Sequence, residues 1–345
     1  MNKNVQNIFS DKVFQDENVD KILKENNYSD ALVILLRNQK LDYQLLEKNY
    51  SLLQDIKTKT FQFDGFNIDA QFNPGRIKST KADVSKEGIE KRECFLCLRN
   101  LPKEQKGINY KDEYLILCNP YPIFYEHFTV SFPKHLPQRI KGSFNSLLNL
   151  SKSLSKYYSV LYNGPECGAS APDHLHFQAV NKNFLKILND SESLIKKYGE
   201  KIIDGRKKEA YCINDGLRKF VLIKSKDMYF INTLFANLYS SLQKVFGNGK
   251  EPMMNILANY DESYGWELYI FLRKKHRPEC YYKKGIEKIM ISPAVIDFTG
   301  TLILPREQDF KKILLDNISE IFDEVSVGKE LFDYLKAHLK KTHQM

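Results

Sequence analysis

The stretch His174-Leu175-His176-Phe177-Gln178-Ala179-Val180 decides how this chain is interpreted. Polar and apolar residues alternate as far as Gln178, which is the period of a half-buried β-strand. Because successive side chains of a strand point to opposite faces, we expect His174, His176 and Gln178 to share one face. A lone histidine in a strand is usually structural and satisfied by a backbone carbonyl. Two histidines and a glutamine on one face instead predict a functional site.

The segment before this strand is rich in small residues. Residues 163–173 read Asn-Gly-Pro-Glu-Cys-Gly-Ala-Ser-Ala-Pro-Asp. Two glycines and two prolines predict a tight loop whose backbone can approach a ligand closely. Ser170 and the backbone amides from Gly168 onwards could surround a phosphate, as nests of small residues do.

Two residues of the strand have side chains suited to phosphoryl chemistry. A neutral imidazole is a competent nucleophile toward phosphorus, and the resulting phosphoramidate can pass the group on. We predict that His176 is this nucleophile. Gln178 is neutral and can donate a hydrogen bond to a phosphoryl oxygen without acting as a strong base. This favours transfer to a bound acceptor over activation of water.

Composition narrows the class of protein. The chain has 345 residues with 42% hydrophobic and 12% aromatic residues, which is typical of a folded globular protein. The net charge is +9, but the basic residues are scattered along the chain with acidic residues between them. A scattered excess of this kind suits anionic ligands in general and does not indicate nucleic acid. No apolar run is long enough to span a bilayer, and residues 1–7 lack the apolar stretch of a signal peptide. We therefore predict a cytoplasmic protein without a membrane partner.

Cys94 and Cys97 are the only closely spaced pair among six cysteines. A C-x-x-C pair alone is compatible with a redox pair, two unrelated thiols or half of a zinc site. A redox role requires a thioredoxin-like βαβ context, which the surrounding sequence lacks. Structural zinc requires four ligands, and His135 and His174 are available to complete the set. We therefore predict structural zinc.

The order of elements predicts an α+β chain in three parts. Residues 1–60 form an N-terminal helical segment, and residues 61–185 form the catalytic half with strands at 114–119 and 127–135 and a helix at 143–162. Residues 186–345 repeat the theme, with a helix near 230–246 and strands at 253–260 and 266–273. The last of these strands takes the place of the histidine strand without its histidines, which predicts a degenerate second half that completes the substrate site.

The pattern His-φ-His-φ-Gln-φ-φ, where φ is apolar, resembles the histidine triad superfamily, in the transferase branch that replaces the third histidine by glutamine. That branch includes galactose-1-phosphate uridylyltransferase, diadenosine tetraphosphate phosphorylase and plant GDP-L-galactose phosphorylase. Leu175 stands where the uridylyltransferases have proline and follows the phosphorylases. The likeness covers roughly residues 73–306 and includes four further segments: the loop at 163–170, His127 with Pro133-Lys134-His135, Asn119-Pro120 with Pro122-Ile123, and Ser292-Pro293-Ala294-Val295 with Thr299-Gly300.

The resemblance implies two histidine-triad-like halves around an antiparallel sheet, with helices packed on the sheet. It implies a nucleotide sugar or dinucleoside polyphosphate as donor, phosphate or a sugar 1-phosphate as acceptor, and it is compatible with a homodimer. Carried over to this chain, it assigns residues as follows: catalysis to His176, Gln178 and Ser170; nucleotide or phosphate binding to Arg76, Asn119, Asn163, Gly168 and Ser170; zinc binding to Cys94, Cys97, His135 and His174.

Two other functions compete with a nucleotidyltransferase. A hydrolase of dinucleoside polyphosphates would use the same strand, but Gln178 disfavours it. A non-catalytic zinc module that binds nucleic acid would use Cys94 and Cys97, but the sequence lacks further clustered ligands and aromatic-basic interleaving.

Overall fold

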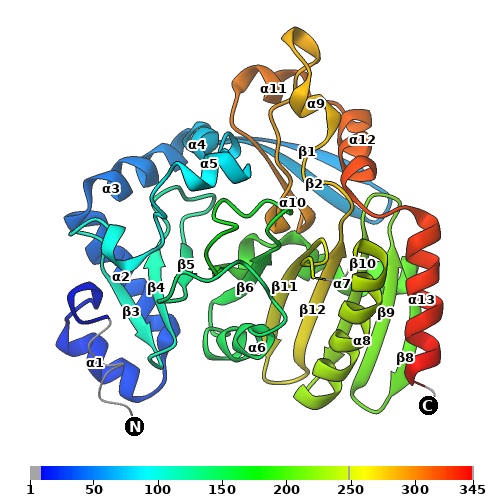
Figure 1. Cartoon of the computed structure of the whole chain (residues 1–345), viewed down its shortest axis with the longest axis horizontal. Coiled ribbons are helices and arrows are strands. Elements are labelled where there is room, and N and C mark those ends of the chain that lie inside the picture. The colour runs from blue at the N-terminus through cyan, green and yellow to red at the C-terminus, as the bar shows by residue number, and fades with distance from the viewer. Residues whose placement is uncertain (1–8, 248, 344–345) are drawn as a thin grey trace.

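A single large sheet organises the chain. The computed structural model describes residues 9–247 and 249–343. The strands are β1 (Lys57–Phe63), β2 (Phe66–Phe72), β3 (Gly107–Tyr110), β4 (Tyr114–Cys118), β5 (His127–Ser131), β6 (Tyr158–Asn163), β7 (His176–Asn181), β8 (Gly199–Gly205), β9 (Lys208–Asn214), β10 (Lys219–Ser225), β11 (Met254–Asp261), β12 (Gly265–Leu272) and β13 (Thr301–Leu304). Ten of them form one antiparallel sheet in the order β3-β4-β5-β7-β6-β11-β12-β10-β9-β8 (Figure 1).

The helices are α1 (Glu17–Lys24), α2 (Tyr28–Asp42), α3 (Gln44–Ser51), α4 (Ile77–Thr80), α5 (Lys86–Glu90), α6 (Phe144–Ser153), α7 (Lys186–Tyr198), α8 (Met228–Phe246), α9 (Glu279–Tyr282), α10 (Val295–Phe298), α11 (Glu307–Lys312), α12 (Leu315–Val325) and α13 (Lys329–His343). A smaller sheet, β1-β2-β13, is separate from the large one.

The large sheet consists of two halves that meet at β6 and β11. From the edge of the sheet to its centre, the strand order of the first half is β3-β4-β5-β7-β6. The strand order of the second half, from the other edge to the centre, is β8-β9-β10-β12-β11. A long connection with α6 joins β5 to β6, and α8 joins β10 to β11 in the same way. The predicted α+β fold, with two similar halves around an antiparallel sheet, is confirmed. β12 occupies the position of β7, and its side chains on the face shared with Gln178 include Tyr269 and no histidine.

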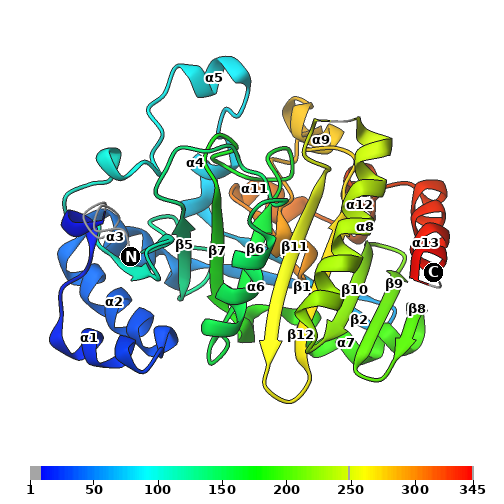
Figure 2. The same cartoon turned by 60° about the horizontal axis from the view of Figure 1, so that its bottom comes forward.

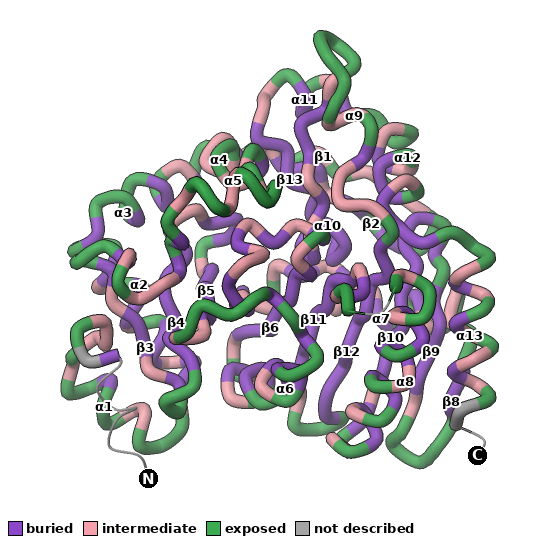
Figure 3. Tube along the Cα trace, in the orientation of Figure 1, coloured by how far each residue is buried: buried purple, intermediate pink, exposed green. Residues whose placement is uncertain are grey.

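Helices cover the two faces of the sheet unequally. Apolar side chains of α2, α6, α8 and α13 bury one whole face in a single core, and Figure 2 shows α6 and α8 in front of the strands. On the opposite face, α7, α10, α12 and the small sheet cover the second half in another core. The strands of the large sheet, apart from β8 at its edge, are therefore buried along most of their length (Figure 3). The opposite face of β5 and β7 carries polar side chains and borders a cavity, which β4 lines with Leu117.

Two predicted boundaries are wrong. The helix expected over residues 143–162 ends at Ser153, and Tyr158–Asn163 form β6. All six residues of β6 are buried because the strand lies between two covered faces. Its apolar residues therefore lack the alternation that identifies a half-covered strand. The second error is the start of the histidine strand, since β7 begins at His176 and His174 lies in the preceding turn.

The predicted N-terminal helical segment contains α1, α2 and α3, and β1 begins at Lys57, before the predicted end of that segment. Residues 1–7, on which the prediction about a signal peptide rests, lie outside the described residues. Among the residues that the structure describes, no helix combines the length and apolarity needed to cross a bilayer.

Candidate active site and metal centre

A cavity of about 390 Å³ opens on the uncovered face of the first half of the sheet. β4, β5 and β7 provide its floor through Leu117, Thr129, His176 and Gln178. A smaller cavity of about 50 Å³ adjoins it, and both are lined by Arg76, Ser79, Ser170 and Gln178. The predicted nucleophile and its glutamine neighbour therefore lie at the bottom of a space of nucleotide size.

Hydrogen bonds fix the protonation state of His176. The Nδ1 atom lies 2.8 Å from the backbone carbonyl oxygen of His174, so Nδ1 carries the hydrogen. Nε2 of the neutral ring then holds a lone pair. Burial lowers the pKa of His176 to about 4, which keeps the ring neutral near pH 7. Within residues 9–247 and 249–343, no partner hydrogen-bonds to Nε2, so the lone pair of the predicted nucleophile is available at the cavity.

Gln178 is oriented by His127, a buried histidine outside the His174–Val180 stretch. The backbone N–H of Ile123 donates to Nδ1 of His127 at 3.2 Å, so the hydrogen of this ring is on Nε2. Nε2 donates in turn to the side-chain oxygen of Gln178, 3.2 Å away. Burial and the positive charge of Arg76 lower the pKa of His127 to about 3, so the ring is neutral. The NH₂ group of Gln178 is thereby left to donate into the cavity.

Arg76 provides a positive charge between the two cavities. Its guanidinium donates to the carbonyl of Tyr121, and burial lowers the Arg76 pKa to about 10, so the group stays charged at neutral pH. Ser170 also lines both cavities. A guanidinium and a hydroxyl beside the NH₂ group of Gln178 form a donor set suited to phosphate oxygens.

The two predicted asparagines are partly engaged by the protein itself. The side-chain oxygen of Asn119 accepts from the backbone N–H of Tyr121 at 2.9 Å. The side-chain oxygen of Asn163 accepts from the side-chain amide of Asn255 at 2.6 Å and from the backbone N–H of Val295 at 2.8 Å. Each asparagine therefore offers a ligand only its NH₂ group as a donor.

Gly168 is required by its backbone conformation and by close packing. It adopts φ +90°, and a Cβ there would lie 2.7 Å from the Cβ of Ala294. The loop that bears Ser170 thus packs directly on the segment before α10, which belongs to the second half of the chain.

We expect Gly168→Ala to destabilise the protein by about 1–3 kcal/mol, because the added methyl group combines backbone strain with a clash. Gly216 is the matched control, since it has φ +84° but no atom lies within 4 Å of the place that an added methyl group would take. Chemical denaturation of both variants separates the two costs. Equal losses of stability for Gly168→Ala and Gly216→Ala would show that contact with Ala294 is unimportant.

Cys94, Cys97, His135 and His174 come together beside the cavity, with one ligand atom of each within 4.8 Å of the others. Cys94 Sγ lies 3.3 Å from Nδ1 of His174, and Cys97 Sγ lies 3.3 Å from Nδ1 of His135. A tetrahedral zinc ion with Zn–S of about 2.3 Å and Zn–N of about 2.0 Å requires ligand separations of roughly 3.3–3.8 Å. The four residues therefore fit a metal ion in a closed, four-ligand site.

Partners of the histidines support this arrangement. His174 Nε2 donates to the carbonyl of Phe132 at 2.7 Å, which leaves Nδ1 unprotonated and aimed at the cysteines. His135 Nε2 lies 3.7 Å from a carboxylate oxygen of Asp173, and Arg92 pairs with the same carboxylate at 2.6 Å. Metal ligands are commonly oriented by such outer partners.

A basic run, Arg273-Lys274-Lys275-His276-Arg277, follows β12. Its sequence is compatible with a site for the acceptor anion and equally with a solvated strand end, and Arg273 is neither of these. Its side chain is fully buried and donates to Asn255 and to the carbonyls of Pro293, Val325, Lys275 and His276. Its donors thus hold the chain together rather than face a ligand.

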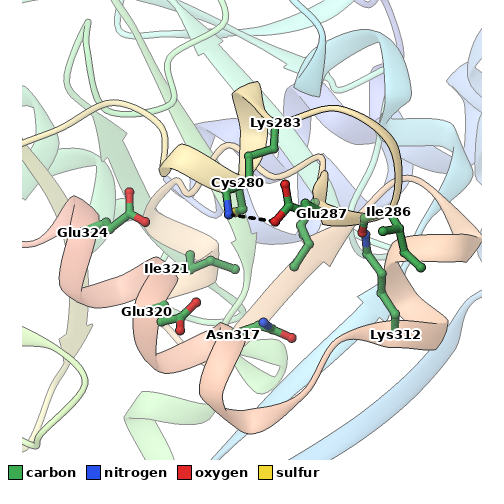
Figure 4. A pocket seen from close by; sticks show the side chains of 10 residues that line it. Cys280, Lys283, Ile286, Glu287, Lys312, Asn317, Glu320, Ile321 and Glu324 are labelled. Atoms are coloured by element: carbon green, nitrogen blue, oxygen red, sulfur yellow. Dashed lines mark hydrogen bonds and ion pairs between the residues drawn. The ribbon is translucent and has the colours of Figure 1, made fainter.

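A separate pocket of about 230 Å³ lies between α9 and α12 (Figure 4). Most of its charged side chains pair with protein groups: Lys283 lies 3.6 Å from Glu287, and Glu324 pairs with Lys275 at 3.2 Å. Burial raises the pKa of the Cys280 thiol to about 11, so the thiol is protonated at neutral pH. This pocket therefore lacks an activated nucleophile.

Two family models match the chain. The first, described as a domain of unknown function (DUF4922), covers residues 35–181, which include the metal cluster and β7. The second, a GDPGP1-like C-terminal domain, covers residues 213–344. Among curated proteins, no sequence matches.

Among solved structures, the chain is similar to yeast Ap4A phosphorylase Apa2, with a TM-score of 0.55 and 14% identity over 82% of this chain and 96% of Apa2. Apa2 in complex with Ap4A gives a TM-score of 0.54 and 13% identity over 84% and 97% of the two chains. Apa2 in complex with AMP gives 0.52 and 15% over 82% and 95%. The predicted resemblance is thus confirmed for the fold, which is similar to that of an Ap4A phosphorylase.

Proposed function

We propose that this chain, which has the fold of the Ap4A phosphorylase Apa2, is a nucleotidyltransferase of the phosphorylase type that forms a covalent adduct on His176. One observation carries the proposal. The Nε2 atom of His176 is unprotonated and lacks a protein partner in the described part of the chain. The hydrogen-bond donors that line the same cavity, on Arg76, Ser170 and Gln178, suit the oxygens of a phosphate. The donor substrate is a nucleotide sugar or a dinucleoside polyphosphate.

In the first step, His176 Nε2 attacks the α-phosphorus of the donor. The bond from phosphorus to the bridging oxygen of the leaving group breaks, and a sugar phosphate or a nucleotide departs. Arg76, Ser170 and the NH₂ group of Gln178 hold the non-bridging oxygens, where negative charge is concentrated. His127 is a positioning residue that keeps the Gln178 oxygen turned away from the phosphate.

In the second step, phosphate or a sugar 1-phosphate attacks the nucleotidyl-histidine and releases Nε2. Gln178 favours this acceptor over water, because a neutral amide cannot remove a proton from a water molecule. The alternative function, a dinucleoside polyphosphate hydrolase, would require a base for water, whereas Gln178 offers a neutral amide at this position. The other alternative, a zinc module binding nucleic acid, does not explain the cavity.

The four-residue cluster fits zinc, which would be structural because four protein ligands leave no open position. Bound zinc would tie Cys94 and Cys97 to His135 and His174. Since the His174 carbonyl accepts from His176, we propose that this cluster positions the nucleophile. We also propose residues 61–185 as the catalytic half and residues 186–345 as the half that completes the substrate site, after a helical segment over residues 1–60. The cytoplasmic location and a homodimer stay predictions.

The proposal is tested by incubating the protein with Ap4A, GDP-glucose, UDP-glucose and ADP-glucose in separate reactions without phosphate, followed by intact-mass measurement. We expect one donor to add the mass of its nucleoside monophosphate. Addition of phosphate should remove the adduct and release a nucleoside diphosphate. Turnover of any donor in phosphate-free buffer, with water as the only acceptor and no adduct at any time, would support the hydrolase instead.

A further inference from the structure

The loop between β5 and α6 contains a fully buried glutamine whose side chain reaches the backbone of the nucleophile. Gln138 is 1% exposed and lies outside both cavities. Its Oε1 accepts from the backbone N–H of His176 at 2.8 Å. Its Nε2 donates to the carbonyl of His176 at 2.9 Å and to the carbonyl of Asn163 at 2.9 Å. One amide group thus satisfies three backbone groups.

These bonds occur where β6 and β7 stop pairing. The paired register runs from Tyr158 with Asn181 to Leu161 with Gln178, and two residues further along each strand Asn163 faces His176 in the same register. At that point the Gln138 amide lies between the two strands and bonds to both. The Gln138 amide therefore takes the place of the backbone hydrogen bonds that would continue the β6–β7 pairing. It fixes the backbone of His176, the first residue of β7.

Gln138 is itself held firmly. Its backbone N–H donates to the carbonyl of Pro172 at 3.1 Å, and two residues later the N–H of Ile140 donates to the Glu251 carboxylate at 2.9 Å. The same carboxylate accepts from the hydroxyls of Tyr162 and Tyr239. The loop is thereby anchored to β6, to α8 and to the segment before β7.

We propose that Gln138 is a positioning residue for the transfer reaction, which fixes the backbone of His176 so that Nε2 points at the α-phosphorus. This inference rests on the proposed function. With the bond from His176 Nδ1 to the His174 carbonyl, each polar atom of His176 except Nε2 has a partner. A side chain fixed at backbone and ring has little freedom at the reacting atom, and a displacement of about 1 Å there can cost on the order of 10²-fold in rate.

The test compares Gln138→Leu with Gln39→Leu. Gln39 is the matched control, because it is also 1% exposed and its amide also bridges backbone groups, those of Glu104 and Lys106. We expect both variants to lose thermal stability. We expect only Gln138→Leu to load His176 about 10²-fold more slowly at saturating donor, measured by rapid quench and intact mass with the donor that loads the wild-type protein. Affinity for the corresponding nucleoside monophosphate should stay within about twofold, since Gln138 does not line either cavity.

A second variant and a second measurement cover the case in which Gln138→Leu does not fold. Gln138→Glu keeps the shape and the acceptor for the His176 N–H, but it loses the donor pair toward two carbonyls. It should load at least 10-fold more slowly, and peptides that contain His176 should exchange backbone hydrogen faster in it than in Gln39→Leu. Loading at the wild-type rate in either folded Gln138 variant would overturn the positioning role. Absence of loading in the wild-type protein would instead overturn the proposed function.

Discussion

Replacing His176 by asparagine is expected to abolish formation of the nucleotidyl adduct and to lower turnover by about 10⁵-fold or more, the scale seen when a covalent nucleophile is removed. An amide nitrogen is not nucleophilic toward phosphorus, whereas the NH₂ group of the new side chain can still donate to the His174 carbonyl that now accepts from Nδ1. The local structure of β7 should therefore survive, and the loss should fall on the rate constant of the chemical step rather than on donor binding.

The measurement is a single-turnover assay with intact-mass detection, together with nucleotide binding by calorimetry. His338→Asn is the control, because it removes a histidine from α13, on the second half of the chain and outside the cavity lining. We expect it to load normally. Normal loading by His176→Asn would show that another atom is the nucleophile, and loss of nucleotide binding in His176→Asn would show that His176 acts in binding.

The alternation of polar and apolar residues predicted the strand that carries His176 and Gln178, because this strand is covered on one face and borders a cavity on the other. The same principle failed for β6, which is covered on both faces and therefore continuously apolar. The two-half sheet was predictable because strands and helices recur in the same order. The position of His174, just before β7, was not predictable in this way. The turn that aims its ring at Cys94 is specified by contacts with residues 132–136.

Two residues that organise the site could not be predicted from the chain alone. His127 alternates with Thr129 and Ser131 on β5, so a polar face was visible, but its bond to Gln178 depends on strand pairing between residues 51 positions apart. Gln138 lies in a loop without periodicity, and only the folded chain brings its amide to His176. The burial of Arg273 is hidden in the same way, because a basic run gives no sign that one member is buried among carbonyls.

After the loss of the nucleophile, removal of the predicted metal ligands should have the largest effect on stability and on adduct formation. We expect Cys94→Ser combined with Cys97→Ser to abolish zinc binding and to lower the melting temperature by on the order of 10 °C, because the zinc affinity of such a site contributes directly to folding free energy. Adduct formation should fall by about 10²-fold, since His174 loses its ring anchor while its carbonyl is the acceptor that fixes His176 Nδ1.

Zinc content by native mass spectrometry, thermal unfolding and single-turnover loading form one set of measurements on the same samples. Cys280→Ser is the matched control, since it removes a thiol that lies in the pocket between α9 and α12 and outside the cluster. It should keep one zinc per chain and the wild-type loading rate. A chelator should reproduce the effects of the double variant in the wild-type protein, and zinc should reverse them. Wild-type protein that contains no zinc and loads His176 at full rate after chelation would separate the nucleophile from the metal. His174 would then act through its hydrogen bond to the carbonyl of Phe132 alone, because that bond fixes the ring without an ion.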